Sequence, residues 1–365
     1  MYDLIVIGGG PGGSSAAITA SRAGAQVLFL ERGTLPRHKV CGEFVSAESL
    51  DLLHGLLNLA HQPLLKQAIR IARTRVFLDG QALETAVDPP AASIARFDLD
   101  AALWASAQDC RVDTRQRVTV QNISGTGPFH VITSGGDFES RAVINASGRW
   151  SNLTADPSRN HGSAKKWLGL KGHFSELETQ ASVDLYFFDG GYCGVQPVSL
   201  RNTVEEQSRV NACAMVRVDV ATTIQDVFSQ NPQLKERSRN WTPLSDPVST
   251  SPLIFRAPQP ERDSVLMAGD AAVFVDPFIG DGISLALRSG TMAAQSLLPF
   301  FRNELSLRDS ALAYRTNYEE KLAPVFKASS MIRRMLALPR AIRIPMIHLV
   351  QATPGLANYV VKRTR

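Results

Sequence analysis

Cysteine is scarce in this chain of 365 residues: it occurs four times, as Cys41, Cys110, Cys193 and Cys213. No two of these residues form a C-x-x-C pair, so the spacing of structural zinc sites and of thioredoxin-like redox sites is absent. We therefore expect no bound metal. We also expect the thiols to be reduced, as is usual in a cytoplasmic protein.

Long apolar runs and blocks of like charge are also missing. No stretch is long and apolar enough to span a bilayer, and no signal-peptide pattern precedes the first strand. The net charge is only +5, and neither a Lys/Arg block nor a nucleic-acid motif is present. These absences favour a cytoplasmic globular protein that does not bind nucleic acid.

The first thirty residues carry the most informative motif. An apolar run over residues 4–7 predicts a buried parallel strand, and Gly8, Gly10 and Gly13 follow it at G-x-G-x-x-G spacing. The first glycine permits a tight turn, the second lets a pyrophosphate approach, and the third lets a helix pack close to the strand. The small residues 14–23 predict that helix, whose N-terminal amides would face phosphate.

A second apolar strand ends in Glu31. This carboxylate lies about twenty residues past the glycines, where dinucleotide-binding folds hydrogen-bond an adenosine ribose. An acidic residue favours an unphosphorylated ribose, and hence FAD or NAD rather than NADP. We also expect Pro11, Gly12 and Arg32 to belong to this site.

The segment from residue 36 to 46 predicts an irregular loop with three basic side chains before Cys41, Gly42 and Glu43. It is either an ordinary basic loop or a loop that lies beside a cofactor. Residues 47–59 predict a helix. Further on, Arg96 is either surface charge or a ligand of phosphate or flavin.

The middle of the chain alternates strands and turns. Asp79-Gly80 predicts a hairpin turn within residues 68–88, and Asp98 is the expected N-cap of a helix over 101–107. An apolar strand leads to Gly148, where a ligand can approach closely. We expect His173 to be a structural histidine rather than a base. Further strands are expected over residues 117–120, 129–133, 138–143, 183–188, 194–198 and 210–218.

A second glycine-rich segment follows an apolar strand near the C-terminal third. Gly269 and Asp270 stand at the strand end, where the carboxylate can accept hydrogen bonds from sugar-type hydroxyls. A Pro-x-x-Gly-x-Gly turn then opens a helix whose amides suit the electron-rich end of a flavin. The residues that we assign to this part of the site are Pro277, Gly280, Asp281, Gly282 and Ile283.

The chain beyond residue 284 reads as helices over 285–301, 310–338 and from 339 onward. The last part is basic and amphipathic. It favours a helix packed on the protein with a solvated basic face, and peripheral contact with the inner membrane surface is the alternative.

Four segments together resemble the FAD-dependent oxidoreductases of the p-hydroxybenzoate hydroxylase-like superfamily. They are the opening turn, the Arg96-Phe97-Asp98 segment, Asn145-Ala-Ser-Gly148, and Gly269-Asp270 with the turn at 277–282. The loop at 36–43 and the turn at 276–283 resemble the geranylgeranyl reductase / flavin monooxygenase branch. The Trp-x-Trp-x-Ile-Pro signature of flavin-dependent halogenases is absent.

This resemblance implies FAD and an α/β fold. A Rossmann-type FAD-binding lobe (1–68, 94–164 and 261–300) would be interleaved with a mainly antiparallel β-sheet substrate lobe (69–93 and 165–260), followed by C-terminal helices (301–365). Because no second G-x-G-x-x-G is present, NAD(P)H would dock transiently as the electron donor, or another protein would reduce the flavin.

Our first hypothesis is a monooxygenase that hydroxylates an aromatic or polyketide-like small molecule, using reduced flavin and O2. The alternative is a reductase of a C=C bond in an isoprenoid or other lipid, with Cys41, Glu43 or Tyr192 as the acid. A flavin-binding protein without turnover is a third reading, disfavoured by the complete set of cofactor motifs.

Overall fold

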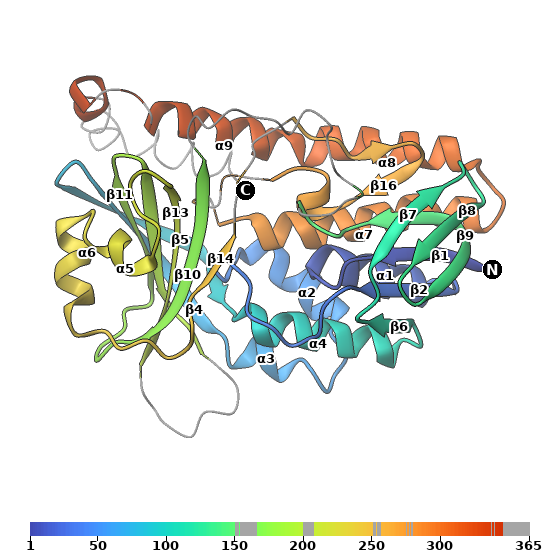
Figure 1. Cartoon of the computed structure of the whole chain (residues 1–365), viewed down its shortest axis with the longest axis horizontal. Helices are drawn as coiled ribbons and strands as arrows, with labels where there is room; N and C mark the ends of the chain where they lie inside the picture. The colour runs from blue at the N-terminus through green and yellow to red at the C-terminus, as the bar shows by residue number, and fades with distance from the viewer. Residues whose placement is uncertain are drawn as a thin grey trace.

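The computed structural model describes residues 1–149, 153, 166–199, 208–250, 253, 257–274, 276, 278, 280–336, 338 and 340–345. Within these residues the chain forms two eight-stranded sheets with helices packed against them. Figure 1 shows the N-terminal sheet at the right and the second sheet at the left, with C-terminal helices running along the top. The chain crosses between the sheets more than once, so the fold is α/β with interleaved lobes.

The N-terminal sheet has the parallel core that its apolar runs predict. β1 pairs in parallel with β2 and with β9, and β2 pairs in parallel with β6. Leu4, Val6 and Ile144 are fully buried, as expected for parallel strands covered on both faces. The strand order is β15 (Glu261–Arg262), β16 (Val265–Met267), β9 (Gly136–Asn145), β1 (Tyr2–Ile7), β2 (Val27–Glu31) and β6 (Asp113–Gln116).

Strand β9 takes part in two pairings. Its N-terminal half pairs antiparallel with β8 (Phe129–Thr133), which pairs with β7 (Val120–Ser124). Its C-terminal half pairs in parallel with β1 and β16. Because β9 ends at Asn145 opposite Ile7, the residues that follow β9 leave the same sheet edge as the glycines after β1.

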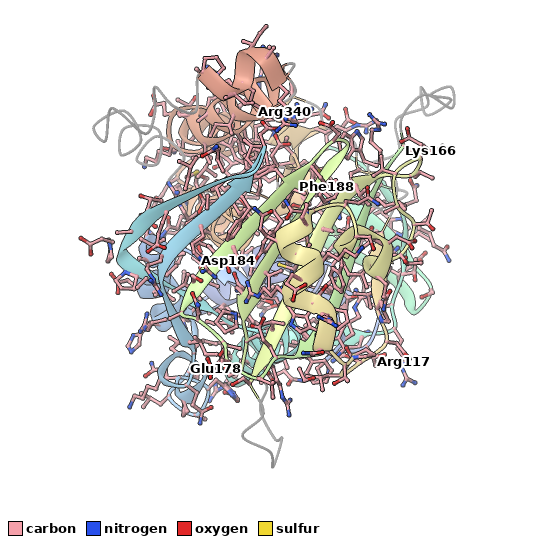
Figure 2. All side chains as sticks on the ribbon, turned by 90° about the vertical axis from the view of Figure 1, so that its left-hand side faces the viewer. Arg117, Lys166, Glu178, Asp184, Phe188 and Arg340 are labelled. Carbon is pink, nitrogen blue, oxygen red and sulfur yellow. The ribbon has the colours of Figure 1, made fainter. Side chains whose placement is uncertain are left out.

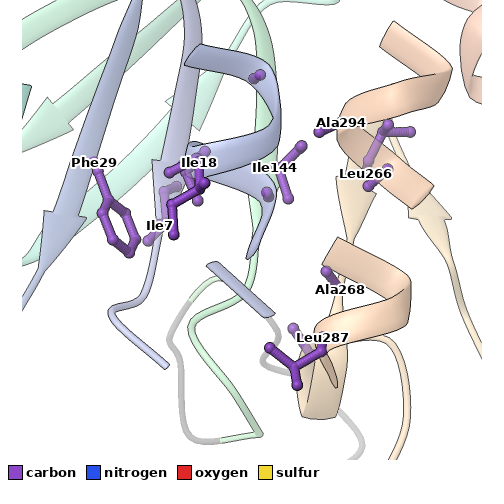
Figure 3. Close-up of a cluster of buried hydrophobic side chains, with 14 of the residues drawn as sticks. Ile7, Ile18, Phe29, Ile144, Leu266, Ala268, Leu287 and Ala294 are labelled. Atoms are coloured by element: carbon purple, nitrogen blue, oxygen red, sulfur yellow. The ribbon is translucent and has the colours of Figure 1, made fainter. Parts of the chain in front are cut away.

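Three long helices pack on this sheet and on one another. They are α1 (Pro11–Arg22), α4 (Arg96–Asp109) and α7 (Gly282–Phe301). Figure 3 shows the buried core between helices and strands, including Ile7, Ile18, Phe29, Ile144, Leu266 and Leu287. The predicted helix over 47–59 is instead a short 3-10 turn, Ala47–Ser49, followed by α2 (Leu50–Leu56); α3 (Pro63–Lys66) comes next.

The second sheet is mainly antiparallel, and its one parallel pair among the described strands joins β11 to β4. The predicted turn Asp79-Gly80 connects β4 to β5, with both residues at positive φ (54° and 82°). The strand order is β14 (Val248–Thr250), β10 (Trp167–Ser175), β13 (Arg209–Arg217), β12 (Gly191–Pro197), β11 (Ser182–Phe188), β4 (Ile69–Leu78), β5 (Gln81–Ser93) and β3 (Phe44–Val45).

The two faces of the second sheet have different partners. Figure 2 views the outer face, where α5 (Ile224–Phe228) and α6 (Pro232–Arg237) lie across the strands and bury Phe174, Val210 and Phe228. The inner face meets the N-terminal lobe: the Asn211 Nδ2 atom donates to the carbonyls of Cys41 and Gly42 at 3.0 and 2.9 Å.

The C-terminal part is helical, but the single helix predicted over 310–338 is wrong. Two helices, α8 (Leu307–Lys321) and α9 (Ala323–Leu336), occupy this region. The break lies at Leu322, which is fully buried. Pro324, in the first turn of α9, lacks the N–H that a continuous helix would require. The part of the basic tail beyond residue 345 lies outside the described residues.

Two smaller expectations also fail. Asp98 is not an N-cap, because α4 begins at Arg96 with Ala95 as its N-cap. The strand expected at 117–120 is replaced by β6 and β7, separated near Arg117, whose φ of 61° interrupts extended backbone. The domain boundaries drawn from the sequence stay a prediction. In the described part of the chain, no helix meets the length and hydropathy needed to cross a membrane.

Candidate functional site

A cleft of about 190 Å³ lies where the two sheets meet. Segments far apart in the sequence form its walls: the turn after β1, the loop before β3, the start of α7 and the inner face of the second sheet. The predicted residues that line it are Gly10, Pro11, Gly12, Cys41, Gly42, Glu43, Arg96, Tyr192, Gly269, Asp270, Gly280, Gly282 and Ile283.

The turn between β1 and α1 needs its glycines. A Cβ on Gly8, whose φ is 106°, would come within 2.4 Å of the Ala146 carbonyl oxygen. A Cβ on Gly13 would come within 1.9 Å of the Gly8 oxygen. Neither residue lines the cleft. Both let the strand and helix approach closely enough for Gly10 and Gly12 to present backbone to it.

Glu31 lies at the end of β2, behind this turn, and is almost fully buried. Its Oε2 accepts a hydrogen bond from the Gly9 amide at 2.7 Å. Its Oε1 accepts from the Gly33 amide at 2.7 Å and from Arg37 Nη2 at 2.9 Å. Two backbone amides and the Arg37 guanidinium therefore fix the position and orientation of this carboxylate next to the glycine turn.

The N-terminus of α7 reaches the cleft from the opposite wall. Gly280, at a φ of 82°, passes so close to Phe44 that a Cβ would meet the ring at 2.8 Å. The amide of Gly269 donates to Ser289 Oγ at 2.9 Å, which ties the segment after β16 to the body of α7. The positive end of the α7 dipole thus points toward the cleft.

Arg96 is held rigidly at the cleft wall by a buried carboxylate. Its Nε and Nη2 donate to the two oxygens of Asp100 at 2.8 and 2.9 Å. Lys39 Nζ donates to the same carboxylate at 2.7 Å. Burial opposes the charged form, but Asp100 outweighs burial and raises the pKa of Arg96. The guanidinium is therefore a permanent, positioned positive charge.

Glu43 is fully buried between the lobes and bonded by three partners. Its Oε1 accepts from the Arg96 amide at 2.8 Å and pairs with Lys171. Its Oε2 lies 2.8 Å from His173 Nε2. Burial alone would raise the pKa of this carboxyl, but Lys171 and His173 lower it to about 2. Glu43 is therefore ionised at neutral pH, and this geometry counts against the hypothesis that it donates a proton.

Tyr192 lies on β12 and supplies a buried hydroxyl to the cleft. Burial raises the pKa of its phenol well above the usual value, so the group keeps its proton at neutral pH. Its ring contacts Phe187 and Phe278 at centroid distances of 5.5 and 5.9 Å. The remaining wall on this side includes Ala214, Met215, Leu253 and Phe274, together with the thiol-bearing Cys213. Cys41, the third candidate acid, lines the cleft with its Sγ 3.3 Å from the Glu43 amide.

Other predicted residues do not line the cleft. Arg32 is exposed beyond β2, whereas Gly148 and Asp281 are sequence neighbours of lining residues. Pro277 lies outside the described residues. The roles of all these residues in cofactor binding stay predictions.

Several residues at the site were missed in the sequence. Asp100 and Lys39 fix Arg96, and Lys171 fixes Glu43 together with His173, which was expected to be structural and is buried against Glu43. The signal for the second pair was available, because Lys171 and His173 are polar residues two apart in a buried strand and so share one face. Arg149 and Phe274, which line the cleft, follow predicted strand ends but had no motif of their own.

The cleft fits FAD. Two helices, α1 and α7, direct uncapped N-termini at it, since neither Gly10 nor Asp281 makes a side-chain cap hydrogen bond. Such ends suit a pyrophosphate and the electron-rich edge of a flavin. The carboxylate of Asp270 lines the cleft at a strand end, where it suits ribityl hydroxyls. Glu31 does not line the cleft, because its oxygens are bonded to the glycine turn and Arg37, so its contact with a ribose stays a prediction. In the described residues, no group of three or more His, Cys, Asp or Glu side chains is arranged to hold a metal ion.

Comparisons with known proteins agree with this fit. Residues 3–147 match the model of the family described as FAD dependent oxidoreductase. The chain is 25% identical to a menaquinone reductase of Mycobacterium tuberculosis, over 93% of this chain and 85% of that protein. It is 24% identical to a digeranylgeranylglycerophospholipid reductase of Methanopyrus kandleri, over 89% and 84%.

A solved structure shows the same fold. The myxobacterial chondrochloren halogenase superposes with a TM-score of 0.75 at 21% identity, covering 89% of this chain and 81% of that one. The glycine turns, the buried carboxylates and these likenesses lead to one conclusion: the chain is similar to FAD-dependent oxidoreductases, and it is an enzyme with oxidoreductase activity.

Proposed function

We propose that this enzyme reduces a carbon–carbon double bond in an apolar, isoprenoid-like substrate. The observation that carries the proposal is the wall opposite the glycine turns. The residues that the second sheet contributes to it are apolar apart from the Tyr192 phenol and the Cys213 thiol, and burial raises the pKa of both groups, so both keep their protons. The relatives named for menaquinone and digeranylgeranylglycerophospholipid reduction support this choice.

Bound FAD supplies hydride transfer in this reaction. The residues of the chain do the rest. Met215, Leu253 and Phe274 surround the substrate and exclude water. Tyr192 holds a proton at its phenol oxygen and delivers it to the carbon that does not receive hydride. Arg96 places a fixed positive charge at the cleft wall, where it favours negative charge on a reduced cofactor.

Hydroxylation of an aromatic compound with O2, which was our first hypothesis from the sequence, is the second candidate. The aromatic cluster of Phe187, Tyr192 and Phe278 favours it, because Phe278 packs edge-to-face on both other rings and Tyr192 presents an aromatic ring to the cleft. In both readings NAD(P)H is proposed to dock transiently and reduce the flavin.

Reduction of the FAD-loaded enzyme under anaerobic conditions separates the two reactions. NAD(P)H or dithionite reduces the flavin, and a prenyl lipid or a phenol is then added. Reoxidation without oxygen, with a saturated product two mass units heavier in mass spectrometry, supports the reductase. A product that forms only when O2 is admitted, and that has gained an oxygen atom, overturns it in favour of the hydroxylase.

A further inference from the structure

A second cavity, of about 700 Å³, lies beneath α9, which runs along the top of the molecule in Figure 1. We call it the α9 chamber. One wall is α9 and the other is the segment between β16 and α7. Val273, Phe274 and Asp276 line the chamber from the segment before α7, and Phe326, Met331 and Met335 line it from α9.

Phe274 is the residue that the chamber shares with the cofactor cleft, because its side chain lines both. The guanidinium of Arg149 lies over the Phe274 ring, 4.2 Å from its centroid. An Arg149 nitrogen also lies 3.8 Å from Asp270 Oδ2. Phe274 therefore lies between the two spaces, and Arg149 packs on its ring from the side of the cofactor cleft.

The chamber wall beside Phe274 is anchored to α9. The Ser329 hydroxyl donates to Asp276 Oδ2 at 3.0 Å, and Arg333 Nε lies 3.2 Å from Asp276 Oδ1. Asp276, which is almost fully buried, is therefore neutralised by a cation from α9. These contacts fix the space between α9 and the loop as a built cavity.

The lining defines the chemistry of an occupant. Most of the walls are aliphatic, aromatic or thioether side chains, which favour an apolar chain. The acidic residue among the described lining residues is Asp276, which Arg333 neutralises. Lys327 and Arg334 are exposed at the chamber edge. They leave an excess of positive charge that suits a phosphate or carboxylate.

We propose that the α9 chamber binds the apolar tail of an anionic amphiphile, with its phosphate or carboxylate at Lys327 and Arg334, and that Phe274 separates this tail from the cofactor cleft. This inference deepens the proposed function, on which it rests, by giving a long substrate a place beyond the flavin. Displacement of the Phe274 side chain joins the two spaces into one path.

Direct binding tests the chamber without turnover. Isothermal titration of the FAD-loaded full chain uses geranylgeranyl diphosphate, palmitate, geranylgeraniol and inorganic diphosphate. Met335→Trp fills the chamber, and we expect it to weaken both anionic amphiphiles by about tenfold or more. Lys327→Gln with Arg334→Gln should weaken the anionic amphiphiles but not geranylgeraniol. Arg308→Gln, at an exposed position of α8, is the matched control and should change nothing.

Three outcomes would overturn the proposal. One is equal affinity of wild type and Met335→Trp for the amphiphiles. Another is binding of inorganic diphosphate as tight as that of geranylgeranyl diphosphate, which would show a phosphate site without a tail. The third is a loss of affinity in Arg308→Gln equal to that in the double variant. The enzyme could also bind the amphiphiles through the chamber and yet reduce no alkene. That result would support the chamber as a binding site and reject only the proposed reaction.

The role of Phe274 is tested with 16-doxyl stearate, whose nitroxide quenches flavin fluorescence at short range. We expect Phe274→Ala to strengthen quenching at saturating probe, because the labelled end of the tail can then pass toward the flavin. Met335→Trp should reduce quenching at a fixed probe concentration. Quenching that is the same in wild type, Phe274→Ala and Met335→Trp would overturn the proposal that Phe274 separates the tail from the cofactor cleft.

Discussion

Gly290 in α7 packs directly on Gly12 in α1: a Cβ at position 290 would lie 2.0 Å from the Gly12 carbonyl oxygen. This contact brings together the two helices whose N-termini face the cleft. We predict that Gly290→Ala forces the helices apart, lowers the free energy of unfolding by at least about 1–3 kcal/mol, and weakens FAD binding. Urea unfolding and flavin titration measure both effects.

Gly55→Ala in α2 is the control for this helix contact, because its added Cβ meets no atom within 4 Å. We expect that variant to match or exceed wild-type stability. A Gly290→Ala protein as stable as wild type, with unchanged FAD affinity, would contradict the close approach of α1 and α7.

The stability of the folded protein should decrease at low pH because Glu43 becomes protonated. Its pKa in the folded protein is about 2, below the ordinary 4.5. The folded state therefore binds this proton less readily than the unfolded chain. The Glu43 contribution is complete above 4.5 and is lost as the pH falls toward 2. Urea unfolding on both sides of pH 4.5 should show this loss in wild type.

Glu43→Gln should weaken this pH dependence and destabilise the protein at neutral pH by about 3–5 kcal/mol, because Lys171 is left buried without its partner charge. Glu236→Gln changes an exposed carboxylate and should leave both quantities near wild type. If Glu43→Gln loses stability below pH 4.5 as steeply as wild type does, other carboxylates cause that loss.

Glu31→Gln tests the ribose end of the cofactor site. A neutral amide accepts more weakly from ribose hydroxyls, and hydrogen bonds to charged groups contribute about 1.5–3 kcal/mol. We therefore predict FAD affinity roughly 10- to 100-fold weaker, measured by fluorescence titration of apoprotein. Asp51→Asn, at an exposed position of α2, is the control. Unaltered FAD affinity in Glu31→Gln would remove Glu31 from the cofactor site.

Tyr192→Phe removes the proposed proton donor and keeps the ring. We expect the rate of alkene reduction to fall by about 10²–10⁴-fold, while FAD content stays at the wild-type level. Rapid-mixing kinetics of the reduced enzyme measure the rate. Tyr186→Phe, which changes a buried tyrosine on the outer face of the same sheet, should leave it unchanged. Equal rates in Tyr192→Phe and wild type would remove Tyr192 from the mechanism.

Much of the architecture was predictable because its signals are local. The apolar run before Gly8 predicted a parallel strand, the run before Gly269 predicted a strand, and Asp79-Gly80 predicted a hairpin. The helix break at Leu322 was missed because the apolar periodicity continues through it. Pro324 was not interpreted as the start of a new helix. The start of α4 at Arg96 was missed because Asp98 is a better capping residue than Ala95, and tertiary contacts decide that boundary.

The site was predictable where backbone shape determines it and unpredictable where side chains from different sheets meet. Glycine spacing identified both turns that face the cleft. The pairing of Glu43 with Lys171 joins residues 128 positions apart, and no local pattern relates them. For that reason Glu43 was expected as an acid, whereas the structure surrounds it with positive charge and hydrogen-bond donors.

The late position of β16 and α7 in the sequence has a consequence for biosynthesis. During translation, the opening turn leaves the ribosome first, but the wall that faces it includes Gly269, Gly282 and Ala286. A nascent chain that ends before Gly269 has only the first half of the nucleotide pocket and lacks the wall that would hold the flavin ring. Cofactor uptake therefore waits until most of the polypeptide has emerged, and a premature stop before α7 should leave a product that cannot retain a yellow colour.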